Sequence, residues 1–297
     1  INRHPGIVKT VSPVFSQVMI AAENAEKTSN GLVTPAILNA LIFAGYKEDF
    51  DPLIKQISGE FDQFPLAPTN ANSVTFDHRQ HTLVLPFGTR LDFGGIAKGW
   101  AAHQVMLRLR DYSPILVDAG GDIAISGKMH DGGSWPVGVA NPFDADNNLA
   151  LLMVANGGVA TSGKDYHRWM FKGEMQHHII DPRNMYPAET DILTVTVVAS
   201  NVMDAETYAK TALILCSKTG ISWLDNHPGV AYLLVFFVLL SLALGWTGSP
   251  IFVSEWFLAF AAFVGLNLLQ SGFTGFCPPE KLLAKLGFKR GNGSCGV

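Results

Sequence analysis

The chain has 297 residues, enough for one large domain or two ordinary domains, each with its own hydrophobic core. Its formal net charge is −4 and no polybasic tract precedes the C-terminal tail, so nucleic acid is not an expected partner. The three cysteines have no metal-ligand spacing, and because the chain begins with Ile1 we expect its N-terminus to be incomplete.

The first third of the chain predicts two helices and a small sheet. Apolar residues at helical spacing predict a helix over residues 14–27, and a shorter helix follows over residues 35–43. Residues 72–92 alternate between apolar and polar side chains, a pattern typical of a β-meander. A glycine-rich turn at residues 94–99 then leads into a helix over residues 100–110.

The middle of the chain predicts strands and helices in irregular order. Strands are predicted at residues 115–117, 135–140, 149–154 and 193–199, and a helix at residues 204–215. No regular βαβ repeat is visible. We therefore expect an α+β fold class, with mixed or antiparallel sheets and flanking helices.

The composition changes after Trp223. Residues 229–246 contain no charge and residues 251–276 contain only Glu255, so each stretch is long enough for a membrane-spanning helix of about 20 residues. The basic tail that follows is expected in the cytoplasm under the positive-inside rule. We favour a C-terminal transmembrane hairpin, with domains at residues 1–226 and 227–297. The alternative makes residues 229–237 the last buried strand of the first domain.

Four short motifs combine small residues with a carboxylate, a hydroxyl or an imidazole. They occupy residues 92–99, 118–122, 161–163 and 177–182. Glycines at a helix start let backbone N–H groups approach a phosphate, and Lys98 adds a mobile positive charge. The first motif is not a Walker A loop, because the lysine precedes the last glycine. Each motif alone is compatible with an ordinary turn, but together they predict one site for a phosphate-bearing ligand.

Two adjacent histidines, and one pair of charged residues on a predicted helix, are the other candidate site residues. His177 and His178 are adjacent in an extended segment, so their side chains point to opposite faces and only one can enter a site. That histidine acts as a general base or phosphate partner, or else it is a buried structural residue. Glu206 and Lys210 are four residues apart on a predicted helix. They form a surface ion pair, or Glu206 faces a metal or the ligand phosphates.

Taken in order, these segments resemble the ApbE family of flavin transferases over residues 2–235. Residues 30–35, 182–183 and 194–199 add to the resemblance. The resemblance implies an ApbE-like fold and an FAD:protein FMN transferase. In that reaction FAD is split at its pyrophosphate, FMN passes to a threonine or serine hydroxyl of a target redox protein, and AMP leaves. Mg²⁺ is the implied metal cofactor.

The resemblance also implies roles for individual residues. His178 matches the catalytic histidine, and Gly95, through its carbonyl, and Glu206 match metal-binding positions. Lys210 matches a metal position in place only, because it stands where the family usually has threonine and cannot ligate while protonated. It therefore replaces part of the metal's charge or weakens Mg²⁺ binding. The resemblance and the motifs together predict these cofactor-binding residues: Ala44, Gly45, Tyr46, Asp92, Lys98, Gly120, Gly121, Asp122, Thr161, Ser162, Gly163 and Asp181.

A second resemblance covers the tail. Residues from 265 onward resemble the small two-helix inner-membrane domain found behind some rhodaneses. It implies a transferase anchored in the bacterial inner membrane, in contact with lipid, with the side of the catalytic domain left open. Two other functions stay open: a membrane-bound FAD-binding module without transfer activity, suggested by the altered metal helix, and an FAD pyrophosphatase in which water replaces the acceptor hydroxyl.

Overall fold

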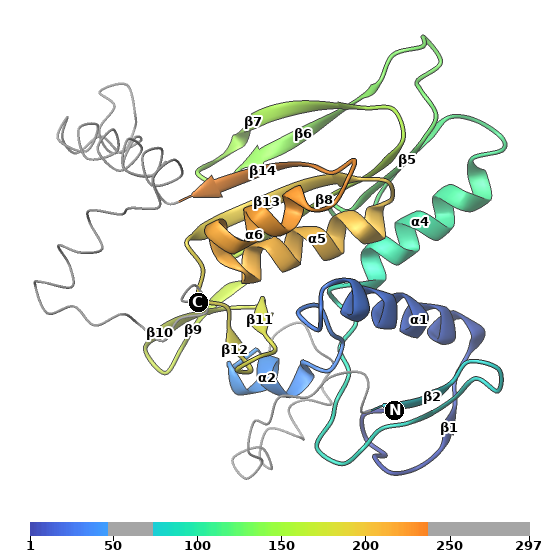
Figure 1. Ribbon diagram of the computed structural model, residues 1–297, viewed down its shortest axis with the longest axis vertical. Helices are drawn as coiled ribbons and strands as arrows, with labels where there is room; N and C mark the ends of the chain where they lie inside the picture. Colours follow the sequence, from blue (N-terminus) through green and yellow to red (C-terminus); the bar gives the residue numbers. More distant parts are fainter. Residues whose placement is uncertain (47–73, 237–297) are drawn as a thin grey trace, which may run out of the picture.

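The computed structural model describes residues 1–46 and 74–236. Its centre is a five-stranded antiparallel sheet in the order β14-β13-β8-β5-β4. The bounds of these strands are β4 Ile115–Asp118, β5 Ile123–Ser126, β8 Gly157–Gly163, β13 Ile192–Ala199 and β14 Ala231–Phe236. Helices α5 (Val202–Ile214) and α6 (Cys216–Asp225) cover one face, and the hairpin of β6 (Trp135–Asn141) and β7 (Asp144–Val154) packs against the other (Figure 1).

The main core lies between the sheet and α5. Val195 and Val197 of β13 have no exposed surface, and they belong to the same buried cluster as Ala205, Ala209 and Ala212 of α5. Alanine at every third or fourth position lets the helix lie close to the sheet. The Asn201 side chain caps α5 by accepting a hydrogen bond from the Asp204 N–H at 2.9 Å, which fixes where the helix begins.

A second layer comes from the N-terminal part of the chain. Helix α1 (Pro13–Thr28) starts at Ser12, whose Oγ accepts from the Phe15 N–H at 3.1 Å, and Pro13 fits the first helical turn. Strands β1 (Lys9–Thr10), β2 (Thr75–Asp77) and β3 (Thr82–Val84) form an antiparallel sheet in the order β1-β3-β2. Both α1 and α4 (Ala97–Leu109) pack against α5 (Figure 1).

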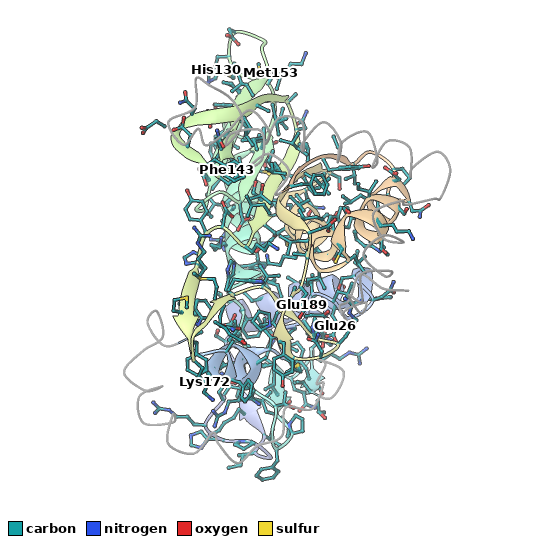
Figure 2. The ribbon with its side chains drawn as sticks, turned by 90° about the vertical axis from the view of Figure 1, so that its left-hand side faces the viewer. Glu26, His130, Phe143, Met153, Lys172 and Glu189 are labelled. Carbon is teal, nitrogen blue, oxygen red and sulfur yellow. The ribbon has the colours of Figure 1, made fainter. Side chains whose placement is uncertain are left out.

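Two short hairpins and α2 (Leu38–Phe43) form a further group. The hairpins are β9 (Arg168–Phe171) with β10 (Glu174–His177), and β11 (Ile180–Asp181) with β12 (Tyr186–Pro187). Ala40 and Leu41 of α2 pack with Ile180 and Met185 of the second hairpin. Met153 of β7 lies near one end of the molecule, and Lys172, in the turn of the first hairpin, lies far from it in the other half (Figure 2).

The fold class predicted from the sequence is confirmed as α+β with antiparallel sheets and helices. The helices predicted over residues 14–27, 35–43 and 204–215 correspond to α1, α2 and α5. The β-meander is reduced to β2 and β3, and β1 supplies the third strand of that sheet. Helix α4 begins three residues earlier than predicted. Lys98 and Gly99 therefore lie in its first turn rather than before it.

The prediction of a membrane helix over residues 229–246 is wrong for residues 231–236. These residues form β14, which pairs with β13 in the register Val195↔Leu234 and Val197↔Tyr232. Their apolar side chains pack against the sheet and α6, with Val235 only 2% exposed, so a charge-free run here reflects a strand. In residues 1–46 and 74–236 no helix is long and apolar enough to cross a bilayer. The rest of the predicted hairpin lies outside the described residues.

Close packing of β8 on the start of α5 gives a first testable prediction. A Cβ on Gly158 would overlap the backbone of Val202, which has no flexible end to move aside. We expect Gly158→Ala to lower the free energy of unfolding by about 3 kcal/mol. Urea denaturation measures this change. Gly133→Ala is the matched control: its nearest neighbours are the side-chain ends of Asp131 and Met129, so its effect should be small. An equal effect of the two changes would contradict the packing argument.

Candidate active site

Two buried carboxylates and two lysines form a charge cluster where α4 begins beside the middle of α5. Lys98 Nζ lies 3.0 Å from Asp122 Oδ2, and Lys210 Nζ lies 2.7 Å from Glu206 Oε1. Both carboxylate side chains are only 4% exposed, whereas the Lys98 and Lys210 side chains are 54% and 17% exposed. Buried carboxylates are stable only when they are paired, and each of these two has its own ammonium.

Two glycines of the first motif let α4 approach α5 at this cluster. A Cβ on Gly99 would lie 2.5 Å from Glu206 Oε2, and one on Gly95 would lie 3.0 Å from Lys210 Cε. Burial raises the pKa of Glu206 and the nearby Asp122 adds to that rise, while Lys210 lowers it. Glu206 and Lys210 were predicted to form a surface ion pair or to place Glu206 toward a ligand. In the structure they form a buried ion pair beside the glycine turn.

The turns that carry Asp92 and Asp122 are shaped by their own carboxylates. Asp92 Oδ1 accepts a hydrogen bond from the Gly94 N–H at 2.9 Å, and burial raises the pKa of Asp92. Gly120 and Gly121 have φ angles of 71° and 94°, in the left-handed region that favours glycine. Together they turn the chain from β4 into β5, so that Asp122 is buried facing Lys98.

His178 presents a buried imidazole next to the charge cluster. Its ring packs edge-on against His167, with the ring centres 5.2 Å apart, and within the described part of the chain its buried Nδ1 has no hydrogen-bond partner. Burial lowers the pKa of His178 to about 3, and the positive charges of His167 and Lys210 contribute to this shift. The imidazole is therefore neutral at pH 7, and it lies within electrostatic reach of Lys210.

The expectation of one extended segment holds for His177, the last residue of β10, but not for His178, which lies in the bend that follows. Its Nε2 lies 3.2 Å from the Ala188 carbonyl oxygen, and burial lowers its pKa to about 4. His177 is thus tied to the neighbouring backbone. Of the two histidines, His178 is the one whose ring borders the charge cluster.

Tyr46, Trp169 and Phe171 form an aromatic group around Ala44 and Gly45, and of these three only Tyr46 was predicted from the sequence. Trp169 Nε1 donates to the Ala44 carbonyl at 2.8 Å, and its ring lies 4.8 Å from the Tyr46 ring. The Phe171 ring packs against Gly45 so closely that a Cβ there would overlap it. Trp169 and Phe171 alternate along β9, and that alternation was the available signal that they share a face.

The other predicted site residues include Thr161, Ser162 and Asp181, and they differ in what their side chains contact. Thr161 Oγ1 lies 2.8 Å from Thr196 Oγ1, while Ser162 is buried on the opposite face of β8. The two hydroxyls therefore do not point the same way. Asp181 is fully occupied by Arg183, whose Nε and Nη2 donate to its two oxygens at 2.9 and 2.8 Å. This arrangement holds the β11–β12 turn, and the cofactor-binding role of Asp181 stays a prediction.

The residues at the expected metal position do not fit a divalent cation. Lys210 lies against both Gly95 and Glu206, the two positions that the resemblance assigned to Mg²⁺. An ammonium about 4 Å from a divalent ion opposes it by about 8 kcal/mol at an effective dielectric constant near 20. Among the described residues, no group of three or more His, Cys, Asp or Glu side chains is arranged to hold a metal.

The profiles of two protein families match the chain. The profile of the ApbE family matches residues 1–234. A profile described as the transmembrane domain of YgaP-like inner membrane proteins matches residues 229–291, so it overlaps β14.

Individual relatives point the same way. The FAD:protein FMN transferase of Treponema pallidum is 35% identical over 169 residues, 52% of this chain and 46% of that protein. The enzyme of the same name from Klebsiella pneumoniae is 33% identical over 170 residues, 56% of this chain and 52% of that protein. The chain thus spans about half the length of these relatives. The crystal structure of the ApbE protein of Thermotoga maritima superimposes with a TM-score of 0.66 at 25% identity, covering 88% of this chain and 82% of that one. Because the family profile covers most of its length, the chain belongs to the ApbE family.

Proposed function

We propose that the chain is an FAD:protein FMN transferase. It cleaves FAD, attaches FMN through a phosphoester to a threonine or serine of an acceptor redox protein, and releases AMP. The observation that carries the proposal is a neutral buried imidazole, His178, within electrostatic reach of a charge cluster that contains two lysines. Similarity to proteins named FAD:protein FMN transferase supports the same activity.

The charge cluster suits the pyrophosphate of FAD. Lys98 is half exposed and Lys210 lies at the glycine turn, so both ammonium groups can offset charge on the phosphates. The backbone around Gly120 and Gly121 leaves open space in which a phosphate can approach closely. Asp122 and Glu206 then act by holding the two lysines in place rather than by touching the anion, which they would repel.

His178 suits the role of general base. The acceptor hydroxyl oxygen forms a bond to the FMN phosphorus, and its proton passes to the neutral imidazole. The bond between that phosphorus and the bridging oxygen breaks, and AMP leaves with the electron pair. The proton on His178 is then released to water. A bound pyrophosphate raises the pKa of the nearby imidazole, because an anion favours its charged form, and this makes His178 a stronger base when FAD is present.

The aromatic group suits the isoalloxazine ring. Tyr46 and Trp169 form a tilted pair whose position depends on the hydrogen bond from Trp169 to Ala44. We expect Trp169→Ala to weaken FAD binding about tenfold, while Trp169→Phe keeps most of the ring surface and loses less. Quenching of flavin fluorescence on titration measures both affinities. Equal binding by Trp169→Ala and the wild-type chain would remove Trp169 from the flavin site.

We propose that the chain is anchored in the bacterial inner membrane through residues 237–297. The YgaP-like match supports this, and the transferase unit, residues 1–226, then extends to the end of β14. With β14 in the sheet, residues 251–276 are the remaining charge-poor stretch of membrane-spanning length. One crossing with a cytoplasmic basic tail places the transferase outside the cytoplasm. Protease should then cleave the transferase unit in right-side-out vesicles but not in inverted vesicles, and the reverse result would contradict this topology.

The activity is tested with the full chain, FAD and a peptide that carries an acceptor threonine. We expect free AMP and a covalent FMN adduct on the peptide, both seen by mass spectrometry. A peptide with alanine in place of the threonine is the control and should gain no adduct. Intact FAD that stays bound would instead indicate a binding module. Free FMN without an adduct would indicate a pyrophosphatase.

A further inference from the structure

Lys210 lies beside Gly95 and Glu206, the two positions at which the family resemblance implies a metal ion. Its side chain is four-fifths buried, lies against the Gly95 turn, and ends 2.7 Å from Glu206 Oε1. Glu206 is itself 3% exposed, and its second oxygen faces Gly99. The ammonium therefore contacts the Glu206 carboxylate, and the Lys210 side chain leaves little room for any side chain at Gly95.

The charges of the cluster balance without any added ion. Asp122 and Glu206 contribute two negative charges, and Lys98 and Lys210 contribute two positive charges. A divalent cation at Glu206 would have to displace Lys210, leaving a buried ammonium without its partner, or else bind beside it against like-charge repulsion. A pyrophosphate is attracted instead of repelled. Both ammonium groups can turn toward it and still remain paired with their carboxylates.

We propose that Lys210 is the built-in counter-charge of this site and that the chain binds and cleaves FAD without a divalent cation. The cleavage half of this inference rests on the proposed function, and the binding half does not. Lys210 stabilises charge on the phosphates in the bound and reacting states, and Glu206 is a positioning residue that holds its ammonium at the Gly95 turn.

The first test measures FAD binding to the full chain by flavin fluorescence, without an acceptor, in EDTA and in millimolar Mg²⁺. We expect the two dissociation constants to agree within about twofold. A titration with Mn²⁺ alone should give no saturable heat. An affinity for FAD that rises about tenfold or more with Mg²⁺, or no binding in either condition, would overturn the proposal.

The second test replaces the ammonium. Lys210→Thr frees Glu206 and adds a hydroxyl, so it offers oxygen ligands to a hard cation. We expect its FAD affinity in EDTA to fall about tenfold or more and to recover when Mg²⁺ is added. Lys218→Thr, at an exposed position on α6, is the matched control and should leave both measurements unchanged. A Lys210→Thr chain that binds FAD as the wild type does in EDTA contradicts the assignment.

A double variant covers the case in which Lys210→Thr does not fold. Glu206→Gln with Lys210→Met removes both charges and keeps the side-chain lengths, so no buried charge is left alone. We expect it to bind FAD weakly in both conditions, and binding equal to wild type overturns the role of Lys210. Failure of the proposed function is separately visible: bound FAD without Mg²⁺ and without AMP release rejects the transfer reaction and keeps the Mg²⁺-free binding site.

Discussion

Replacing His178 with glutamine should lower the rate of AMP release by a factor of about 10²–10⁴, the usual contribution of a general base. Glutamine can still form hydrogen bonds but cannot take a proton at neutral pH. FAD affinity should change little, because in the proposed arrangement the lysines bind the pyrophosphate and the aromatic pair binds the isoalloxazine ring. Single-turnover kinetics with an acceptor peptide measures the chemical step, and fluorescence titration measures binding.

His177→Gln is the natural control for this change. It alters a histidine of similar burial whose Nε2 lies 3.2 Å from the Ala188 carbonyl oxygen. Its rate of AMP release should stay within a few-fold of wild type, after correction for the fraction of folded protein. If His177→Gln and His178→Gln slow the reaction equally, the loss comes from the backbone of this segment, and the assignment of His178 as base is wrong.

The two buried histidines should also make the protein sensitive to acid. Their pKa values, about 4 and about 3, lie below the usual value of 6.5, so the unfolded chain binds more protons than the folded one between pH 6.5 and those values. The free energy of unfolding therefore decreases as the pH falls below 6.5, because protonation stabilises the unfolded chain. Each histidine contributes a slope of about 1.4 kcal/mol per pH unit. Together they should cost about 4 kcal/mol at pH 5 relative to pH 7.

Other groups act in the opposite direction, so the measurement compares variants. Burial raises the pKa values of Asp92 and Asp165, and these carboxyl groups favour the folded state as the pH falls. Urea denaturation at pH 7 and pH 5 should give a smaller acid loss for His177→Gln, and a smaller one again for His177→Gln with His178→Gln. Identical losses in the wild type and the double variant would show that neither imidazole is buried in its neutral form.

Local signals predicted the parts of the fold that depend on local chemistry. Helix α1 was predicted because its apolar residues recur at helical spacing over residues 14–27. Strand β14 was predicted only as the alternative to a membrane helix, because its partner β13 lies more than thirty residues away along the chain. β1 has two residues and no local pattern, and it exists because β3 pairs with it. Strand partners of this kind depend on contacts distant in the sequence.

Site residues were predictable where a short stretch of sequence contains both the reactive side chain and the glycines or helical spacing around it. The glycine turn, Lys98 and the Glu206–Lys210 pair were all recognised from spacing, and the structure brings them together. The burial of that pair was not predictable, since helical spacing cannot tell a solvent face from one covered by a second helix. Trp169 was missed for a similar reason: it contacts Ala44 and Tyr46, which lie more than a hundred residues earlier.

The most direct test of this account is the position of FAD in a crystal structure of the full chain grown with FAD and EDTA. We expect the pyrophosphate at Lys98 and Lys210 and the isoalloxazine ring against Tyr46 and Trp169. A cavity of about 460 Å³ lies among α1, α4 and α5 beside Trp100 and shares no residue with the charge cluster. FAD bound in that cavity, or away from both lysines, would contradict the account.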